Sequence, residues 1–406
     1  MTKIFVLALR NIFRNKRRTL ITFLAIISGM SALIVFGGFV HFTFWGLRET
    51  TIRSQLGHIQ IYKKGYTEEG LSKPLEYLID NYEMFITEFQ KLPYVEIITP
   101  RLSFSGLIST GEKTLTCIGS GVVSENESKL ASFESLVEGR DIINEDEAVI
   151  GNVLKKSLGV KIGDYVTLLT TTVDGSINAV DVKIVGVSQS GSQEYDAVIV
   201  KVPLKTVQKM LNTKSVDKIL ILLDKTEHTD VVAKHIENII KEKSLSLEFK
   251  KWYELASFYQ SVVRLYTGMF NVVKIIIAVI VFFSIANTMT MSIFERTREI
   301  GTLRAIGTKK FVTIILFLVE GLLIGVIGGL LGIIGGIGIA TIINLSGGIY
   351  IPPPPMMTTG YTALILIIPK VVINSYISTI LVSVLSSFYP AVKAANLKIV
   401  EALRYV

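Results

Sequence analysis

Apolar residues are concentrated in four long stretches of this chain, separated by more polar segments. A helix that crosses the hydrocarbon core of a bilayer needs about 20 consecutive, mostly apolar residues, and each stretch reaches that length. We therefore predict four transmembrane helices. We expect Pro390 to end the last of them, because proline disrupts a helix interior. The predicted helices cover residues 20–45, 269–293, 311–343 and 371–389.

The pattern changes in residues 46–265, between the first two predicted spans, where short strand and helix signals alternate. Residues 57–62 alternate apolar and polar side chains, as a half-buried strand does. Residues 104–119 are typical of a hairpin with its turn at Thr110–Lys113. Further strands are predicted within 148–171 and at 180–188 and 217–223, and helices within 148–171 and at 202–211 and 229–243. The predicted fold class is a membrane protein with four transmembrane α-helices and a large α+β domain between the first and second helices.

Basic residues mark three short segments beside these spans. Residues 1–19 contain six lysines and arginines and no acid, residues 294–310 contain five bases and two acids, and residues 390–406 contain three bases and one acid. Lysine and arginine in short loops are enriched on the cytoplasmic side of membranes. We therefore predict that these three segments are cytoplasmic. The 46–265 domain and the loop of residues 344–370, which has no charge before Lys370, are then extracytoplasmic.

Composition supports a membrane protein and argues against other classes. Half of the residues are hydrophobic and 19% are charged, and the mean hydropathy is +0.50, which is too apolar for an ordinary soluble protein. The net charge of +8 lies mainly beside the spans, so it indicates topology and does not favour nucleic-acid binding. Cys117 is the sole cysteine, which rules out an intramolecular disulfide. We expect it to be a buried apolar residue.

The sequence lacks the common catalytic and metal-binding motifs. It contains no G-x-S-x-G, H-E-x-x-H or C-x-x-C, and its four histidines have no spacing typical of metal ligands. His58, in the strand predicted at 57–62, is expected to be structural. We therefore predict no catalytic residue, no bound metal and no cofactor on this chain. The domain at 46–265 is expected to bind a partner or to transmit a conformational change.

The third predicted span contains two rows of glycines with a period of four residues. Such rows let two helix backbones approach each other closely in a membrane. The pattern predicts close helix packing, either within one chain or across a dimer. The rows are Gly321, Gly325 and Gly329, and Gly328, Gly332 and Gly336.

The same span carries one acidic residue, Glu320. A charged side chain within a membrane helix is costly, at about 3 kcal/mol on insertion scales, so it should face protein or water. Two interpretations have equal weight: a functional role, and a structural role as a hydrogen-bonded carboxyl, ionised or protonated, that holds the helices together. No second acid or histidine in the spans makes a convincing proton relay with it.

The segment between the second and third spans is strongly charged. As a helix from Glu295 to Gly307, it would place Ile300, Leu303 and Gly307 on one side and pair Glu295 with Arg298. A positive-inside loop, a helix lying on lipid headgroups and a solvated connector are all consistent with this composition. A fourth hypothesis is a docking helix for a cytoplasmic motor protein, which the mixture of acids and bases favours over anionic lipid.

Several motifs of the chain resemble a known family. "ERTREIGTLRAIGTKK" (295–310), "FLVEGLLIGVIGGLLG" (317–332) and "PAVKAANLKIVEALR" (390–404) resemble the FtsX-type permease domain of the MacB/FtsX/LolCE superfamily of ABC transporters. "AVIGNVLKKSLGVKIGDYVTL" and "VPLKTVQKML" look like the periplasmic core domain of MacB-like permeases. "GHIQIYKKGY" looks like the segment after the first span in lipoprotein-releasing permeases. Together the matches touch nearly the whole chain.

The resemblance implies a permease that works as a dimer, with an identical or a related second copy. The segment of residues 294–310 would be the coupling helix that sits on the ATPase subunit, and residues 1–19 an amphipathic helix leading into the first span. The residues expected to contact or shape the ATPase interface are Glu295, Arg296, Arg298, Glu299, Gly301, Leu303, Arg304 and Gly307. The chain has no G-x-x-x-x-G-K-[ST] motif. ATP and Mg are therefore expected on a separate ATPase in two copies, unlike MacB itself, in which the ATPase is fused to the permease.

The implied activity is mechanotransmission, in which ATP-driven motion passes through the spans to the outer domain. The favoured branch is release of lipoproteins from the outer face of the bacterial cytoplasmic membrane, with a lipoprotein or a periplasmic adaptor as a further partner. Export of a peptide or small toxic molecule is an alternative. FtsX-like signalling to cell-wall hydrolases is another, and a receptor without an ATPase is a third.

Overall fold

The computed structural model describes residues 2–12, 14, 16–70, 72–130, 135–190, 192–353 and 360–404. The chain divides into two compact units. Residues 1–44, 262–350 and 362–406 form what we call the helical unit, and residues 45–261 with 351–361 form what we call the sheet unit. The predicted combination of four membrane-crossing helices and a large α+β domain between the first two is confirmed.

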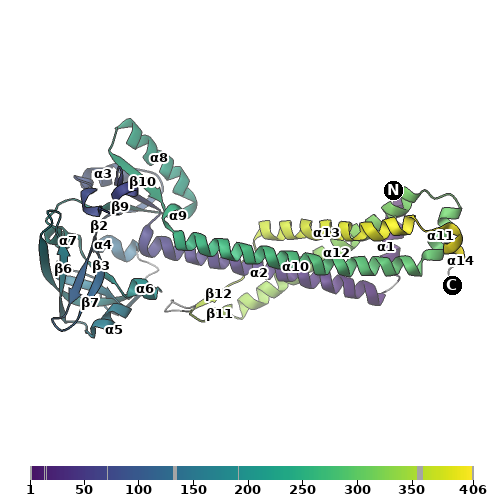
Figure 1. The fold of residues 1–406 in the computed structure, drawn as a ribbon, viewed down its shortest axis with the longest axis horizontal. Coiled ribbons are helices and arrows are strands. Elements are labelled where there is room, and N and C mark those ends of the chain that lie inside the picture. Colours follow the sequence, from purple (N-terminus) through teal and green to yellow (C-terminus); the bar gives the residue numbers. More distant parts are fainter. Residues whose placement is uncertain are drawn as a thin grey trace. The chain divides into compact units, whose positions relative to one another are not determined.

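Four long helices dominate the helical unit: α2 (Lys16–Thr51), α10 (Ser257–Glu295), α12 (Lys310–Leu345) and α13 (Pro369–Ala395) (Figure 1). Each is long and apolar enough to cross a membrane. α2 and α10 are longer than the predicted spans, since α2 begins at Lys16 and α10 at Ser257.

The expectation that Pro390 ends the last span is wrong, because α13 continues through it to Ala395. A proline removes one backbone hydrogen bond, and packed membrane helices tolerate that loss. Pro390 is buried, and the next turn of α13 places Ala391 and Ala394 in an apolar cluster with Phe317 of α12. Packing against α12 therefore holds this part of α13 in the helical conformation.

The two glycine rows of α12 face two different helices of the same chain. A Cβ atom at Gly321, Gly325 or Gly329 would lie 1.9–2.7 Å from side-chain atoms of Ser387, Ser383 and Tyr376 on α13. A Cβ atom at Gly328, Gly332 or Gly336 would lie 2.5–2.9 Å from side-chain atoms of Ile26, Met30 and Ile34 on α2. Both rows therefore serve close packing within one chain, with α12 between α2 and α13.

Several shorter elements complete the ends of these helices and the segment between α12 and α13. α1 covers Thr2–Ile12, so the amphipathic segment predicted for residues 1–19 ends early and its last residues belong to α2. Within residues 344–370, two short strands pair with each other, and residues 354–359 lie outside the described part of the chain. The remaining elements are α11 (Thr297–Ala305), α14 (Ile399–Arg404), β11 (Ile349–Ile351) and β12 (Tyr361–Ala363).

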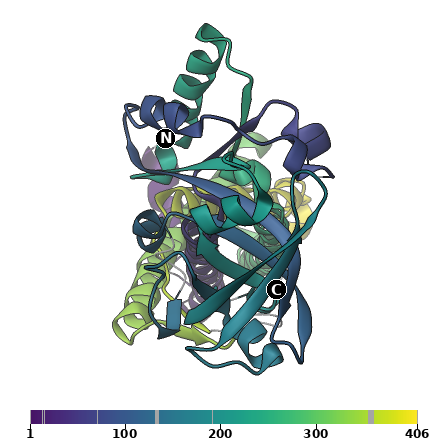
Figure 2. The same cartoon turned by 90° about the vertical axis from the view of Figure 1, so that its left-hand side faces the viewer.

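A closed circuit of strands forms one half of the sheet unit. β2 (Val95–Ser109) pairs with β3 (Thr114–Val122), and the pairing continues through β8 (Ile199–Pro203), β5 (Glu147–Gly151), β7 (Ile177–Gln189) and β6 (Tyr165–Thr171) back to β2. β4 (Ser135–Gly139) pairs antiparallel with the last residues of β7. Phe104, Ile150 and Ile184 belong to one buried apolar cluster, and Figure 2 shows the strands as a curved sheet. Cys117 is buried in this core, as predicted.

The other half of the sheet unit is an antiparallel sheet in the order β10, β1, β9 and the first part of β2. Its strands are β1 (Ile59–Lys63), β9 (Lys218–Leu223) and β10 (Leu247–Lys251). The predicted hairpin over 104–119 is the β2–β3 pair, and Gly111 supplies the positive φ of 87° in its turn. β2 is long enough to belong to both halves and therefore joins them.

The longer helices of this unit pack on the strands through an apolar face. In α8, for example, Val232, Ala233 and Ile236 are buried while the opposite face is charged. The helices are α3 (Tyr82–Phe89), α4 (Ser124–Leu130), α5 (Asn152–Leu158), α6 (Gln193–Asp196), α7 (Leu204–Leu211), α8 (Thr229–Glu242) and α9 (Trp252–Leu255). Short π or 3-10 segments cover Ile52–Leu56, Tyr66–Gly70, Pro74–Glu76 and Thr226–His228.

Candidate docking site around helix α11

Helix α11 is shorter than the helix predicted from Glu295 to Gly307, because the backbone leaves the helical conformation at both ends. Arg296 leaves the helical conformation, with φ −114° and ψ 13°, and separates α10 from α11. At the other end Gly307 has φ 105°; its N–H donates to the Arg304 carbonyl, and the Thr308 N–H donates to the Leu303 carbonyl. These two bonds and the left-handed glycine form a Schellman cap. Gly307 therefore ends the helix and does not lie on its apolar face.

The break at Arg296 changes the partner of Glu295. The predicted pair of Glu295 with Arg298 is not the pairing that the structure shows: Glu295 is the last residue of α10, and its two carboxylate oxygens accept hydrogen bonds from Arg18 of α2, both at 3.1 Å. Arg298 lies on α11 and is exposed. Glu295 thus joins two membrane-spanning helices, and Arg298 is left facing outward.

Arg296 turns inward to Glu320 of α12. The Arg296 Nη1 atom donates to Glu320 Oε1 at 3.1 Å, and Asn11 Nδ2 of α1 donates to the same oxygen at 2.5 Å. The Arg296 guanidinium also lies 5.9 Å from the centre of the Phe317 ring, one turn before Glu320. Only 9% of Arg296 and 2% of Glu320 are exposed. The carboxyl is therefore an ion-paired, buried anion that links α1, α11 and α12.

Glu299 adds a more exposed pair to the same side of α11. It accepts a hydrogen bond from Arg14 at 2.6 Å and one from Arg296 Nε at 3.3 Å. The hydrogen bond from Arg14 is the main reason that the pKa of Glu299 lies below its usual range. The segment between α1 and α2 is thus tied to α11 by charge.

The opposite side of α11 rests on the C-terminal helices. A Cβ atom at Gly301 would lie 2.8 Å from the Ala402 Cβ of α14, so glycine permits this close contact. Arg304 Nη1 donates to the backbone carbonyls of Ala395 and Leu397, at 2.7 and 2.9 Å. Gly301 and Arg304, both predicted to serve the docking surface, therefore hold α11 against the end of α13 and α14.

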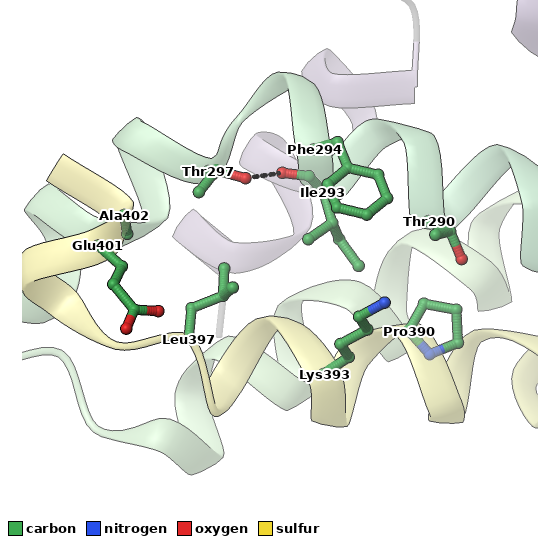
Figure 3. A pocket seen from close by; sticks show the side chains of 9 residues that line it. All are labelled: Thr290, Ile293, Phe294, Thr297, Pro390, Lys393, Leu397, Glu401 and Ala402. Atoms are coloured by element: carbon green, nitrogen blue, oxygen red, sulfur yellow. Dashed lines mark hydrogen bonds between the residues drawn. The ribbon is translucent and has the colours of Figure 1, made fainter. Parts of the chain in front are cut away.

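A cavity of about 180 Å³ lies beside this contact, between the α10–α11 turn and α13 with α14 (Figure 3). Its lining is mainly apolar, and Lys393 Nζ stands 5.4 Å from the centre of the Phe294 ring. The Thr297 hydroxyl donates to the Ile293 carbonyl at 3.0 Å and stabilises the turn. The lining residues are Thr290, Ile293, Phe294, Thr297, Pro390, Lys393, Leu397, Glu401 and Ala402.

The remaining face of α11 and its cap is open and partly apolar. Leu303 is 48% exposed and Ile306, in the cap, is 80% exposed, whereas Ile300 is buried with Phe317. Arg298 flanks this face. We call Arg298, Leu303 and Ile306 the α11 docking face. The sequence argument did not single out Ile306, although the i, i+3 spacing on a helix places it beside Leu303.

Two residues of the sheet unit that could carry chemistry, His58 and Cys117, are buried. His58 is fully buried; its Nδ1 accepts from the Leu223 N–H at 3.0 Å, and its Nε2 lies 3.1 Å from the Thr226 hydroxyl. Burial lowers the pKa of His58 to about 3, so the ring is neutral at physiological pH. Burial also raises the pKa of Cys117 to about 11, which keeps it an unreactive thiol.

Comparison with known proteins gives consistent matches along the chain. Residues 19–239 match the family described as the MacB-like periplasmic core domain, and residues 271–399 match the FtsX-like permease C-terminal family. The macrolide export ATP-binding/permease protein MacB of Shewanella oneidensis is 25% identical over 327 residues, which cover 77% of this chain and 47% of MacB. The chain thus spans about half the length of that relative.

Two shorter relatives match over more of their length. The uncharacterized ABC transporter permease YknZ of Bacillus subtilis is 23% identical over 98% of both chains. The lipoprotein-releasing system transmembrane protein LolC of Xylella fastidiosa is 26% identical over 77% of both chains. The matches extend across the helical unit and the sheet unit alike.

Proposed function

This chain belongs to the MacB/FtsX/LolCE family of ABC transporter permeases, and we propose that it couples ATP hydrolysis on a separate ATPase to a conformational change of its sheet unit. The chain itself would be non-catalytic, with ATP and Mg held by two copies of the ATPase. The absence of a G-x-x-x-x-G-K-[ST] motif in the 406 residues supports this division of labour.

The observation that carries the proposal is the support given to the α11 docking face. The buried pair of Arg296 with Glu320 holds the start of α11 on one side, and Ala402 with the carbonyls of the α13 end holds α11 on the other. A solvated connector needs no such anchoring, whereas a helix that receives force does. Exposed leucine and isoleucine beside an arginine are also suited to a protein groove, since apolar anchors dominate protein interfaces.

The direction of the coupling follows from charge. Arg14, Arg18 and the bases of α11 lie at one end of the helical unit, and we propose that this end is cytoplasmic. The sheet unit would then lie outside the cytoplasmic membrane of a bacterium. α1 has exposed Phe5, Val6 and Leu7, which suits a helix lying in the headgroup region.

The proposed cargo is a lipoprotein, released from the outer face of the membrane with a second permease copy as partner. Support comes from the likeness to LolC over 77% of both chains and from the segment around β1 that resembles lipoprotein-releasing permeases. Export of a peptide or small toxic molecule and signalling to cell-wall hydrolases predict different partners, so one capture experiment separates all three.

The experiment is a detergent pull-down of the tagged chain from its own membrane, with mass spectrometry of the captured proteins. We expect the wild-type chain to capture an ATPase with a Walker motif and a lipoprotein. Leu303→Asp with Ile306→Asp should reduce ATPase capture at least about tenfold, because the substitutions place charge in an apolar contact. Ile177→Asp, at an 81% exposed residue of the sheet unit, is the matched control and should capture the ATPase normally.

Each outcome has a distinct meaning. A cell-wall hydrolase captured without a lipoprotein would support signalling, and a periplasmic adaptor without a lipoprotein would support export. If the wild-type chain captures no ATPase, the coupling function is wrong.

A further inference from the structure

Three segments far apart in the sequence meet at one carboxylate oxygen. Glu320 Oε1 on α12 accepts hydrogen bonds from Asn11 Nδ2 of α1 and from Nη1 of Arg296, the residue between α10 and α11. Glu320 is the only charged residue of α12 after Lys310. It is therefore the one point of that span at which a full charge binds the segments beside it.

The Glu320 carboxylate reaches α11 at the start of that helix, where Arg296 interrupts the helical backbone. Arg296 caps the first turn of α11, and the Ile300 N–H donates to the Arg296 carbonyl at 2.9 Å. The Arg296 side chain holds three groups at once: Glu320 and Phe317 of α12, and Glu299 on the first turn of α11. A tilt of α11 that kept these contacts would have to carry α12 with it.

The site is also shielded from water, which makes the connection strong and specific. Glu320 and Arg296 are both buried, and a buried charge that loses its partner is strongly unfavourable. Exposed pairs such as Arg14 with Glu299 are weak by comparison and can follow movement without resisting it.

We propose that Glu320 is a positioning residue that fixes α11 to α12, so that displacement of α11 by the ATPase moves α12 with it. This inference rests on the proposed function and assigns the polar residue of the span a role in it. Glu320 acts through Arg296, and Asn11 holds the carboxylate in place from α1. The alternative is a static role, in which the carboxyl only stabilises the packed helices.

The first arm of the test uses the permease chain alone, in lipid nanodiscs. Spin labels are placed at Ala305→Cys on α11 and at Ile342→Cys on α12, two exposed residues, in a Cys117→Ala background. We expect Glu320→Gln to broaden the distribution of label distances relative to the wild type. Leu322→Gln puts the same amide on the same span at a 40% exposed residue, and it should leave the distribution unchanged.

The second arm adds the captured ATPase, with and without a non-hydrolysable ATP analogue. In the wild type the distance between the labels should stay constant, because α11 and α12 move together, while labels on α12 and α10 report a nucleotide-dependent change. Glu320→Gln should keep the ATPase bound and reduce the nucleotide-dependent shift in the ratio of the two distance populations about two- to thirtyfold, the range for mutations within coupling networks.

Rescue separates positioning from a static role. Asn11 and Glu320 are hydrogen-bonded, so Asn11→Asp with Glu320→Gln restores a carboxylate beside Arg296 with the amide and acid exchanged. We expect this double variant to recover the nucleotide response. Recovery of expression and folding without recovery of the response would overturn the proposal.

The two arms also separate failure of this inference from failure of the proposed function. If Glu320→Gln behaves like Leu322→Gln in both arms, the positioning role is wrong while ATP coupling stands. If the first arm gives the expected broadening but the wild-type chain never responds to the ATPase and nucleotide, the proposed function is wrong.

Discussion

Each unit of the molecule contains a glutamate that is largely shielded from water and held by cations, but the two glutamates join different kinds of elements. Glu127 on α4 pairs with Arg101 of β2 at 2.6 Å and with Lys201 of β8 at 2.8 Å, all within the sheet unit. Glu320 pairs with Arg296, between two helices, and with Asn11 of α1. The first connects strands that the sheet already holds together. The second connects helices that few other polar contacts join.

This difference shows that ion pairs shielded from water can have different roles in one molecule. The strands around Glu127 are fixed by ladder hydrogen bonds, so the ion pairs add stability to a structure that cannot rearrange locally. Near Glu320 the helical conformation is interrupted at Arg296, so the side chains of Arg296 and Glu320 help to set the position of α11. The same chemistry therefore serves rigidity in one unit and, on our proposal, transmission in the other.

The largest expected effect is loss of the Glu127 carboxylate. Glu127→Leu leaves Arg101 and Lys201 without this anion in a buried site, which should lower the free energy of unfolding of the sheet unit by about 3–5 kcal/mol. Cys117 is buried in the same unit, so the urea dependence of its reaction with a thiol reagent reports this unfolding in the full chain. Glu145→Leu, at a residue half exposed beside Lys209, is the control and should change little. Equal effects of the two variants would contradict the account.

Acid should weaken the same unit without any mutation. Burial alone would raise the pKa of Glu127, but the charges of Arg101 and Lys201 lower it from 4.5 to about 2. The folded state therefore binds the proton less tightly than the unfolded chain, so this contribution is complete above pH 4.5 and is lost as the pH falls towards 2. A shift of this size corresponds to roughly 3 kcal/mol. Protection of Cys117 should fall over this range, and the fall should be smaller in Glu127→Leu.

A smaller effect is expected from closing the glycine contact between α12 and α13. In Gly321→Ala the new Cβ would lie 1.9 Å from Ser387 Oγ and 3.0 Å from the Ser383 carbonyl oxygen, so the helices must separate. Overpacking of this kind costs about 1–3 kcal/mol. Heating the purified chain in detergent and measuring the monodisperse fraction would test it, with Ser387→Gly as the compensating change. Gly338→Ala, where nothing lies within 4 Å of the new Cβ, should be neutral, and a loss of stability there would count against the packing argument.

The features that the sequence predicted are those set by local pattern. Apolar length predicts the spans, the four-residue period of Gly321 and its neighbours predicts close packing, and the turn at Thr110–Lys113 predicts a hairpin. Each depends on residues near one another in the chain. Pattern alone left open whether the glycines pack within one chain, because the partner surfaces of Ile26 and Ser387 are distant in sequence.

The arrangement around α11 could not be predicted in the same way. In a regular helix Glu295 would pair with Arg298. Because the helix is interrupted at Arg296, Glu295 instead accepts hydrogen bonds from Arg18, which is far away in the sequence. Arg304 is a charged residue of the type expected on a docking surface, yet its guanidinium donates hydrogen bonds to two backbone carbonyls at the end of α13. In both cases the observed hydrogen-bond partner is distant in the sequence, so local pattern could not predict it. The sequence pattern did not single out Ile306, which the structure shows to be 80% exposed.

The most direct test of the central claim is site-specific photo-crosslinking in the native membrane. A photoreactive amino acid replaces Ile306 on the α11 docking face, and in a control chain it replaces Ile177 of the sheet unit, which is equally exposed. The account predicts that Ile306 crosslinks to an ATPase with a Walker motif and that Ile177 does not. If the Ile306 probe captures only lipid, or if both probes capture the same proteins, α11 is not the helix through which ATP hydrolysis reaches this permease.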